Sequence, residues 1–119
     1  MDESFFLFLE ETDWCYRIGQ RGWKVYFLPQ AEIVHVGQQS VHLDPESTMP
    51  KFYENFVRFY RTHRSRSALR TAALKSVIAL ACAIRIGLWT WRGRFGAAGD
   101  HARRMRRGYG RVLRRLALF

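Results

Sequence analysis

The chain has 119 residues, a net charge of +10 at pH 7 and 48% hydrophobic residues. This length allows at most one domain and is short for a catalytic domain of ordinary size, while the apolar content excludes general disorder. The charge is uneven, because residues 1–46 carry eight acidic and three basic side chains and residues 47–119 carry two acidic and seventeen basic ones. The acidic part is therefore suited to protons or metal ions, and the basic part to a phosphate-rich surface.

The acidic part is predicted to contain one helix and two strands. The helix begins near Glu11, where early carboxylates suit the positive end of a helix, and it ends before Gly22. WKVYFLP at residues 23–29 alternates large apolar side chains with others and is typical of a strand. AEIVHVG at residues 31–37 is a second β-branched run, and the polar residues 38–50, with two prolines, indicate a loop or linker.

The basic part is predicted to be helical. Residues 47–67 are expected to form a linker and an amphipathic helix, which begins near Lys51 and gathers phenylalanines on one face. A more apolar helix is expected over residues 68–92. The arginine-rich segment that follows is expected to be broken at Gly108 and Gly110.

Residues 68–119 are predicted to be a membrane-associating tail. The longest uncharged run, SVIALACAI, has nine residues between Lys75 and Arg85, whereas a spanning helix needs about 20 largely apolar residues. Trp89 and Trp91 next to arginines are typical of an interfacial anchor. A helix lying in the surface of an anionic membrane is therefore favoured over a transmembrane span. The alternative is a core helix whose partner domain is absent.

Three carboxylates follow the apolar run FFLFL, namely Glu10, Glu11 and Asp13. From the residues alone, this cluster can be a helix start favoured by the dipole, or a site for a proton or a metal ion. Arg17 is expected to pair with one of the carboxylates. His35, between two valines, can be a buried structural histidine or a metal ligand.

The other histidines lack a convincing spacing to a partner and are expected to be structural or solvated; these are His42, His63 and His101.

The segment DESFFLFLEETDWCYRIGQRGWKVYFLPQAEIVHVGQQS, residues 2–40, resembles the C-terminal part of the catalytic domain of family 2 glycosyltransferases, especially rhamnosyltransferase-like members. The shared order is an acidic pair, two aromatics, a second acidic pair, an Asp before Cys and Arg, a Gly-Trp strand, a proline and a Val-x-His-x-Gly segment that ends in Ser. The matching residues are Asp2, Glu3, Phe5, Phe6, Glu10, Glu11, Asp13, Cys15, Arg17, Gly22, Trp23, Pro29, Val34, His35, Gly37 and Ser40.

This resemblance implies an α/β fold class, with a partial GT-A domain at residues 1–46 before the mostly helical tail. It also implies an inverting transfer of sugar from a nucleotide-sugar donor to a hydroxyl of a saccharide or lipid-linked acceptor. The catalytic base falls on Glu11, with Glu10 or Asp13 as substitutes, and His35 matches a residue that ligates the metal or contacts the diphosphate. A divalent cation, Mg or Mn, is implied for the full-length enzyme.

The family's first nucleotide-binding strands and its Asp-x-Asp motif do not occur in these residues. The chain is therefore expected to be a C-terminal fragment, inactive alone, of an enzyme of cell-envelope polysaccharide or glycolipid synthesis, bound peripherally to the cytoplasmic face of the membrane.

Two alternatives belong to other classes. One is a small basic module that binds nucleic acid; no recognition motif for nucleic acid is visible, so no specific nucleic-acid partner is expected. The other is a non-catalytic module or partner subunit at the membrane surface.

Overall fold

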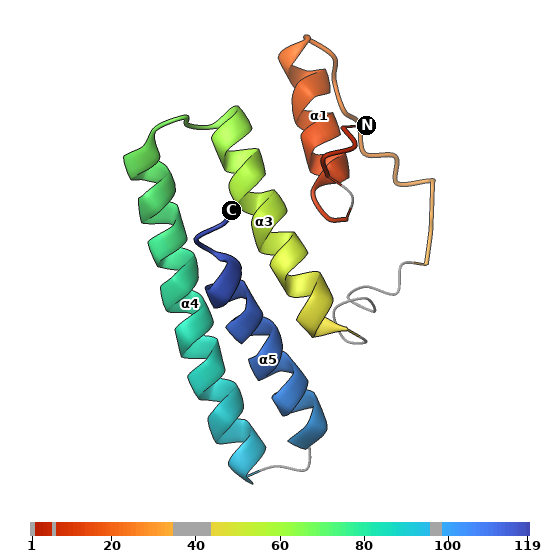
Figure 1. Ribbon diagram of the computed structural model, residues 1–119. Coiled ribbons are helices and arrows are strands. Elements are labelled where there is room, and N and C mark those ends of the chain that lie inside the picture. The colour runs from red at the N-terminus through yellow and green to blue at the C-terminus, as the bar shows by residue number, and fades with distance from the viewer. Residues whose placement is uncertain (1, 6, 35–43, 96–98) are drawn as a thin grey trace.

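The computed structural model of the chain describes residues 2–5, 7–34, 44–95 and 99–119, and their regular secondary structure is helical (Figure 1). In Figure 1, α5 lies between α3 and α4, against which it packs, and α1 lies beside the C-terminal half of α3. The helices are α1 (Glu10–Gln20), α3 (Pro45–His63), α4 (Ala68–Phe95) and α5 (Gly99–Arg115).

The predicted α/β fold class is wrong for the described residues, because none of them forms a strand. The predicted strand at residues 23–29 is irregular, and the side chains of Trp23, Val25 and Phe27 are 73%, 63% and 89% exposed. A strand needs a neighbour for its backbone hydrogen bonds and an apolar surface for one face. The described residues provide neither. Of the second predicted strand, residues 31–34 are also irregular, and the rest lies outside the described residues.

The predicted first helix is confirmed at both ends. α1 begins at Glu10, one residue before the expected position, and ends at Gln20. Gly22 has a φ of 81°, and its N–H donates to the carbonyl of Gly19 at 3.0 Å. A glycine in this left-handed conformation is a common helix terminator, which explains why the chain leaves the helix there.

The predicted loop reaching to Pro50 is wrong from Pro45 onward, because α3 begins at Pro45. The Asp44 side chain caps α3 by accepting a backbone N–H of the first turn at 3.1 Å, and proline suits the first helical position. Pro50 lacks the N–H that would bond the carbonyl of Glu46. Arg111 on α5 donates to that carbonyl instead, with Nη1 at 3.4 Å from the oxygen. Both prolines are thereby compatible with the helix.

Residues 51–92 were predicted to be mainly helical, and α3 and α4 confirm this. The predicted breaks at Gly108 and Gly110 are wrong, because α5 runs through both. A Cβ atom at Gly108 would lie 2.7 Å from the carbonyl oxygen of Pro45, so the glycine lets α5 approach the start of α3 closely.

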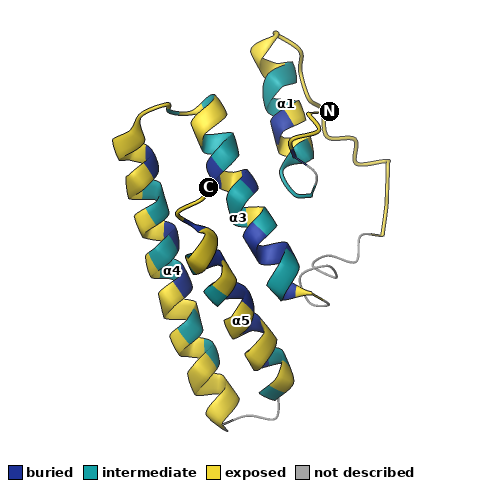
Figure 2. Cartoon of the chain, viewed as in Figure 1, coloured by how far each residue is buried: buried dark blue, intermediate teal, exposed yellow. Residues whose placement is uncertain are grey.

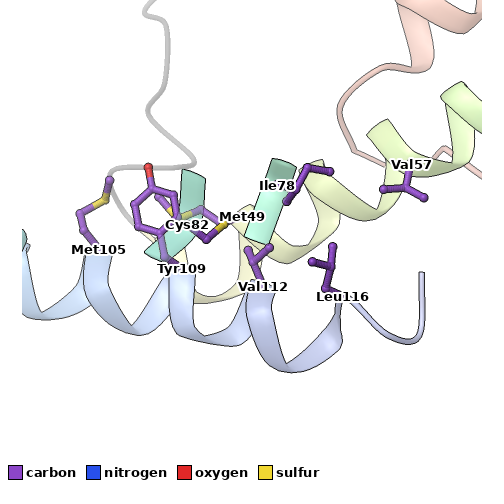
Figure 3. Close-up of a cluster of buried hydrophobic side chains, with 8 residues drawn as sticks. All are labelled: Met49, Val57, Ile78, Cys82, Met105, Tyr109, Val112 and Leu116. Carbon is purple, nitrogen blue, oxygen red and sulfur yellow. The ribbon is translucent and has the colours of Figure 1, made fainter. Parts of the chain in front are cut away.

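The hydrophobic core lies among α3, α4 and α5 (Figure 3). The buried residues of α5 recur every three or four positions, and the arginines between them are exposed. Figure 2 shows buried and exposed residues alternating along this helix. The core residues are Met49, Val57, Ile78, Cys82, Met105, Tyr109, Val112 and Leu116.

Candidate functional site

The chain enters α1 through a turn in which two non-glycine residues have left-handed backbone conformations. The φ angles of Phe8 and Leu9 are 70° and 66°, a region that side chains with a Cβ atom rarely adopt. The amide of Asn55 on α3 donates to the carbonyls of Leu7 and Phe8 at 2.8 and 3.2 Å. α3 therefore holds the turn that presents the first carboxylates of α1.

Asp13 is almost fully buried, with 1% of its surface exposed. Its Oδ2 accepts from Nε of Arg17 at 2.8 Å, which confirms the expected pairing of Arg17 with a carboxylate. Its Oδ1 lies 2.6 Å from Nε2 of His63 at the end of α3. A carboxylate only accepts hydrogen bonds, so Nε2 carries the proton in this contact. Both oxygens of Asp13 are thus engaged by positively chargeable partners.

His63 has a more specific place than its sequence indicated. The Tyr16 hydroxyl donates to the carbonyl of His63 at 3.2 Å. The rings of Tyr16 and Phe59 lie 4.6 and 4.8 Å from the imidazole. Asp13 and His63 are 50 residues apart in the chain, and no local spacing signals a contact over that distance. His63 therefore agrees with the structural alternative expected for it, but its contact with Asp13 was missed from the sequence.

The two other predicted catalytic carboxylates lie in the first turn of α1, in different surroundings. Glu10 is partly buried, and its Oε2 is shielded from solvent with no hydrogen-bond partner within the described part of the chain. Glu11 is exposed. Glu10, Glu11 and Asp13 thus lie on one short stretch of helix, and Glu11 is the most exposed of the three.

An open cleft of about 430 Å³ begins one helical turn after Glu11. Trp14 and Trp23 supply aromatic faces that are 47% and 73% exposed, and cationic side chains stand next to them. Exposed indole faces beside positive charges suit flat or sugar-like groups that carry negative charge. The lining residues are Trp14, Arg17, Ile18, Arg21, Trp23 and Lys24.

The predicted metal ligand His35 lies outside the described residues. Within residues 2–5, 7–34, 44–95 and 99–119, no group of three histidine, cysteine, aspartate or glutamate side chains is placed to hold a metal ion. Asp13 in particular has both oxygens occupied by Arg17 and His63. The described residues therefore do not form a divalent-cation site by themselves.

Comparison with known proteins gives a partial and distant similarity. No family model and no solved structure matches the chain. Two curated proteins match it, the N-acetylglucosaminyl-diphospho-decaprenol L-rhamnosyltransferases of Mycobacterium tuberculosis strains CDC 1551 / Oshkosh and ATCC 25618 / H37Rv. Each is 30% identical over 64 residues, which is 54% of this chain and 21% of the relative. The chain thus spans about a fifth of the length of these relatives, and its similarity to glycosyltransferases is limited to that part.

Proposed function

We propose that this chain is part of an inverting glycosyltransferase that moves a sugar from a nucleotide-sugar donor to a hydroxyl acceptor in cell-envelope polysaccharide or glycolipid synthesis. The observation that carries this proposal is the 64-residue similarity to two rhamnosyltransferases. Their names specify transfer of L-rhamnose to a lipid-linked diphosphate sugar. By extension, we propose a lipid-linked or saccharide acceptor for this chain.

In the proposed reaction Glu11 is the general base. An acceptor hydroxyl is a weak nucleophile until a carboxylate takes its proton in the transition state, which contributes a factor of about 10² to 10⁴. Glu11 is exposed in the first turn of α1, whereas Asp13 is buried between Arg17 and His63. Asp13 then acts as a positioning residue that fixes α1, and the partly buried Glu10 does not take the proton.

A divalent cation remains a prediction for the complete enzyme. The departing nucleoside diphosphate gains negative charge, which Mg²⁺ or Mn²⁺ stabilises in enzymes of this chemistry. The roles proposed for Glu11 and Asp13 rest on the exposure of Glu11 and on the contacts of Asp13.

We further propose that α4 lies in the surface of the cytoplasmic membrane. Residues 68–94 are long and apolar enough to cross a bilayer, and only 11% of their most apolar stretch is buried. The exposed apolar side chains recur on the outer face of α4 at helical spacing, whereas Arg85 reaches inward to the Tyr53 hydroxyl at 3.2 Å. The outer residues are Val77, Leu80, Ile84, Leu88 and Trp91.

A surface position is proposed rather than a span because α4 does not stand alone. It packs along α5, whose outward arginines could not enter the hydrocarbon region without large cost. Lying flat, α4 can bury its outer face in the interface while those arginines meet anionic headgroups at its border.

The test of the catalytic proposal is sugar transfer by the protein read from the complete reading frame that contains these 119 residues. Membranes that contain this protein are incubated with nucleotide-activated radiolabelled L-rhamnose, and the label is followed into lipid extracts. Extractable label that is absent from membranes without the protein is the expected result. Absence of transfer with this and other nucleotide sugars would overturn the proposal.

A further inference from the structure

An open cavity of about 580 Å³ lies where α3 ends and the C-terminal segment returns to it. We propose that this cavity binds a phosphate monoester or diphosphate group. The inference goes beyond sugar transfer, because it rests on the cavity alone. The lining residues are Glu54, Arg58, Arg61, Thr62, Arg66, Leu118 and Phe119.

The cavity carries an excess of positive charge. Arg58 lies 3.4 Å from Glu54, to which Arg115 also extends at 3.7 Å, so this one carboxylate is already shared. The described residues include every aspartate and glutamate of the chain, and none of them forms an ion pair with Arg61 or Arg66. Two guanidinium groups therefore face the cavity without a carboxylate partner in the described part of the chain.

The chemistry of these donors favours phosphate over other anions. A guanidinium offers a planar fork of N–H groups that matches two oxygens of a phosphate, and two such forks suit a group with two or more charges. Thr62 also lines the cavity, and its hydroxyl is a neutral group that can donate a hydrogen bond. A single carboxylate would satisfy only one of the two unpaired arginines.

The cavity lining also includes two apolar side chains. Leu118 is 81% exposed and lies beside Phe119. These side chains can cover an apolar or aromatic part attached to the phosphate, which a phospholipid and a soluble nucleotide both provide. The shared element is the phosphate group, and its source is a matter for experiment.

The test is calorimetric titration of the 119-residue chain with inorganic pyrophosphate at constant ionic strength. The Arg61→Gln/Arg66→Gln variant is compared with Arg104→Gln/Arg114→Gln, which removes the same charge from the exposed surface of α5. We expect at least a tenfold loss of affinity in the first variant and less than a twofold loss in the second. Equal losses in both variants, or no saturable binding by the unmodified chain, would overturn the proposal.

A single Arg66→Gln variant gives an independent measurement, because Arg66 is exposed in the turn between α3 and α4 and its loss leaves the core unchanged. Circular dichroism of each variant verifies that its helical content is kept. Pyrophosphate affinity that stays unchanged in the folded single and double variants would also overturn the proposal.

Two further arms identify the source of the phosphate. Vesicles with phosphatidic acid, a monoester, are compared with phosphatidylglycerol vesicles of equal surface charge, and uridine diphosphate is compared with uridine. A preference for phosphatidic acid that is lost in the double variant supports a lipid source. Tight binding of uridine diphosphate without that preference supports a soluble source. If phosphatidic acid binds no better than phosphatidylglycerol, and uridine diphosphate binds no better than uridine, the proposed phosphate site is contradicted.

Discussion

Nε2 of His63 lies 2.6 Å from Oδ1 of Asp13 and joins the end of α3 to the first half of α1. The same carboxylate holds Arg17 one turn further along α1. Because Asp13 is buried and doubly paired, the direction of α1 depends on it. The position of the exposed Glu11, two residues earlier, consequently depends on the contacts that Asp13 makes with His63 and Arg17.

Replacing Asp13 with alanine is expected to lower the free energy of unfolding by about 3 kcal/mol, because it leaves His63 and Arg17 without their buried partner. Urea unfolding followed by circular dichroism measures the change. Glu32→Ala is the matched control, since Glu32 is an exposed carboxylate in an irregular segment. Equal stability of the two variants would contradict the structural role of Asp13.

Gly108→Ala is expected to destabilise the protein by about 1 to 3 kcal/mol, because the new methyl group meets backbone that cannot move aside easily. Its Cβ would lie 2.7 Å from the Pro45 carbonyl oxygen and 2.8 Å from the Met49 sulfur. Gly110→Ala, in the same helix, has nothing within 4 Å and is expected to stabilise it by up to about 1 kcal/mol. Thermal unfolding of both variants tests this, and a stabilising Gly108→Ala would show that α3 and α5 do not approach as described.

The sequence was most informative where local chemistry decides the structure. The start of α1 near Glu11, its end before Gly22 and the helices over residues 51–92 all follow from charge, glycine and apolar spacing. Asn55 and His63, which hold the candidate site, could not be predicted, because their partners lie 47 to 50 residues away.

The predictions that were wrong also failed because they depended on contacts between segments that are distant in the sequence. The alternation in residues 23–29 satisfies the pattern of a strand, but no described segment pairs with it. Gly108 resembles a helix break in sequence, yet it is the position where α5 contacts Pro45 and Met49. Whether a glycine ends a helix or lets two helices approach depends on the neighbouring helix, which local sequence does not contain.

The outer face of α4 is expected to drive membrane binding. A Leu80→Ser/Ile84→Ser/Leu88→Ser variant should bind anionic vesicles about a hundredfold more weakly, since each of these half-exposed side chains contributes about 1 kcal/mol when a lipid surface covers it. Vesicle flotation measures binding at two salt concentrations, because salt screens only the attraction of the arginines.

The matched control for α4 is Val25→Ser/Phe27→Ser/Ile33→Ser, which removes exposed apolar groups from an irregular segment. It is expected to bind vesicles as the unmodified chain does. Equal losses in both variants would contradict docking through α4, and duplex DNA that binds more tightly than the vesicles would support the nucleic-acid alternative.

Stability is expected to fall at alkaline pH. Burial raises the pKa of the Cys82 thiol, although Arg85 and the Tyr53 hydroxyl oppose this. Because the thiol pKa is raised in the folded state, the protonated thiol contributes fully to stability below the ordinary thiol pKa of about 8.5. This contribution is lost as the pH rises from there through the pKa of the folded state. The free energy of unfolding should therefore fall less steeply with pH in Cys82→Ala than in the unmodified chain or in Cys15→Ala. Equal slopes in the three proteins across this pH range would contradict the prediction.

The role of Glu11 is the central claim, and a Glu11→Gln variant of the protein from the complete reading frame tests it most directly. Glutamine keeps the size of the side chain and removes the base, so kcat for sugar transfer should fall by about 10² to 10⁴ while KM for the donor stays unchanged. Glu10 is partly buried and does not take the proton. In the Glu10→Gln variant kcat should therefore fall by less than about tenfold. Full activity of Glu11→Gln, or a larger loss in Glu10→Gln, would contradict the account.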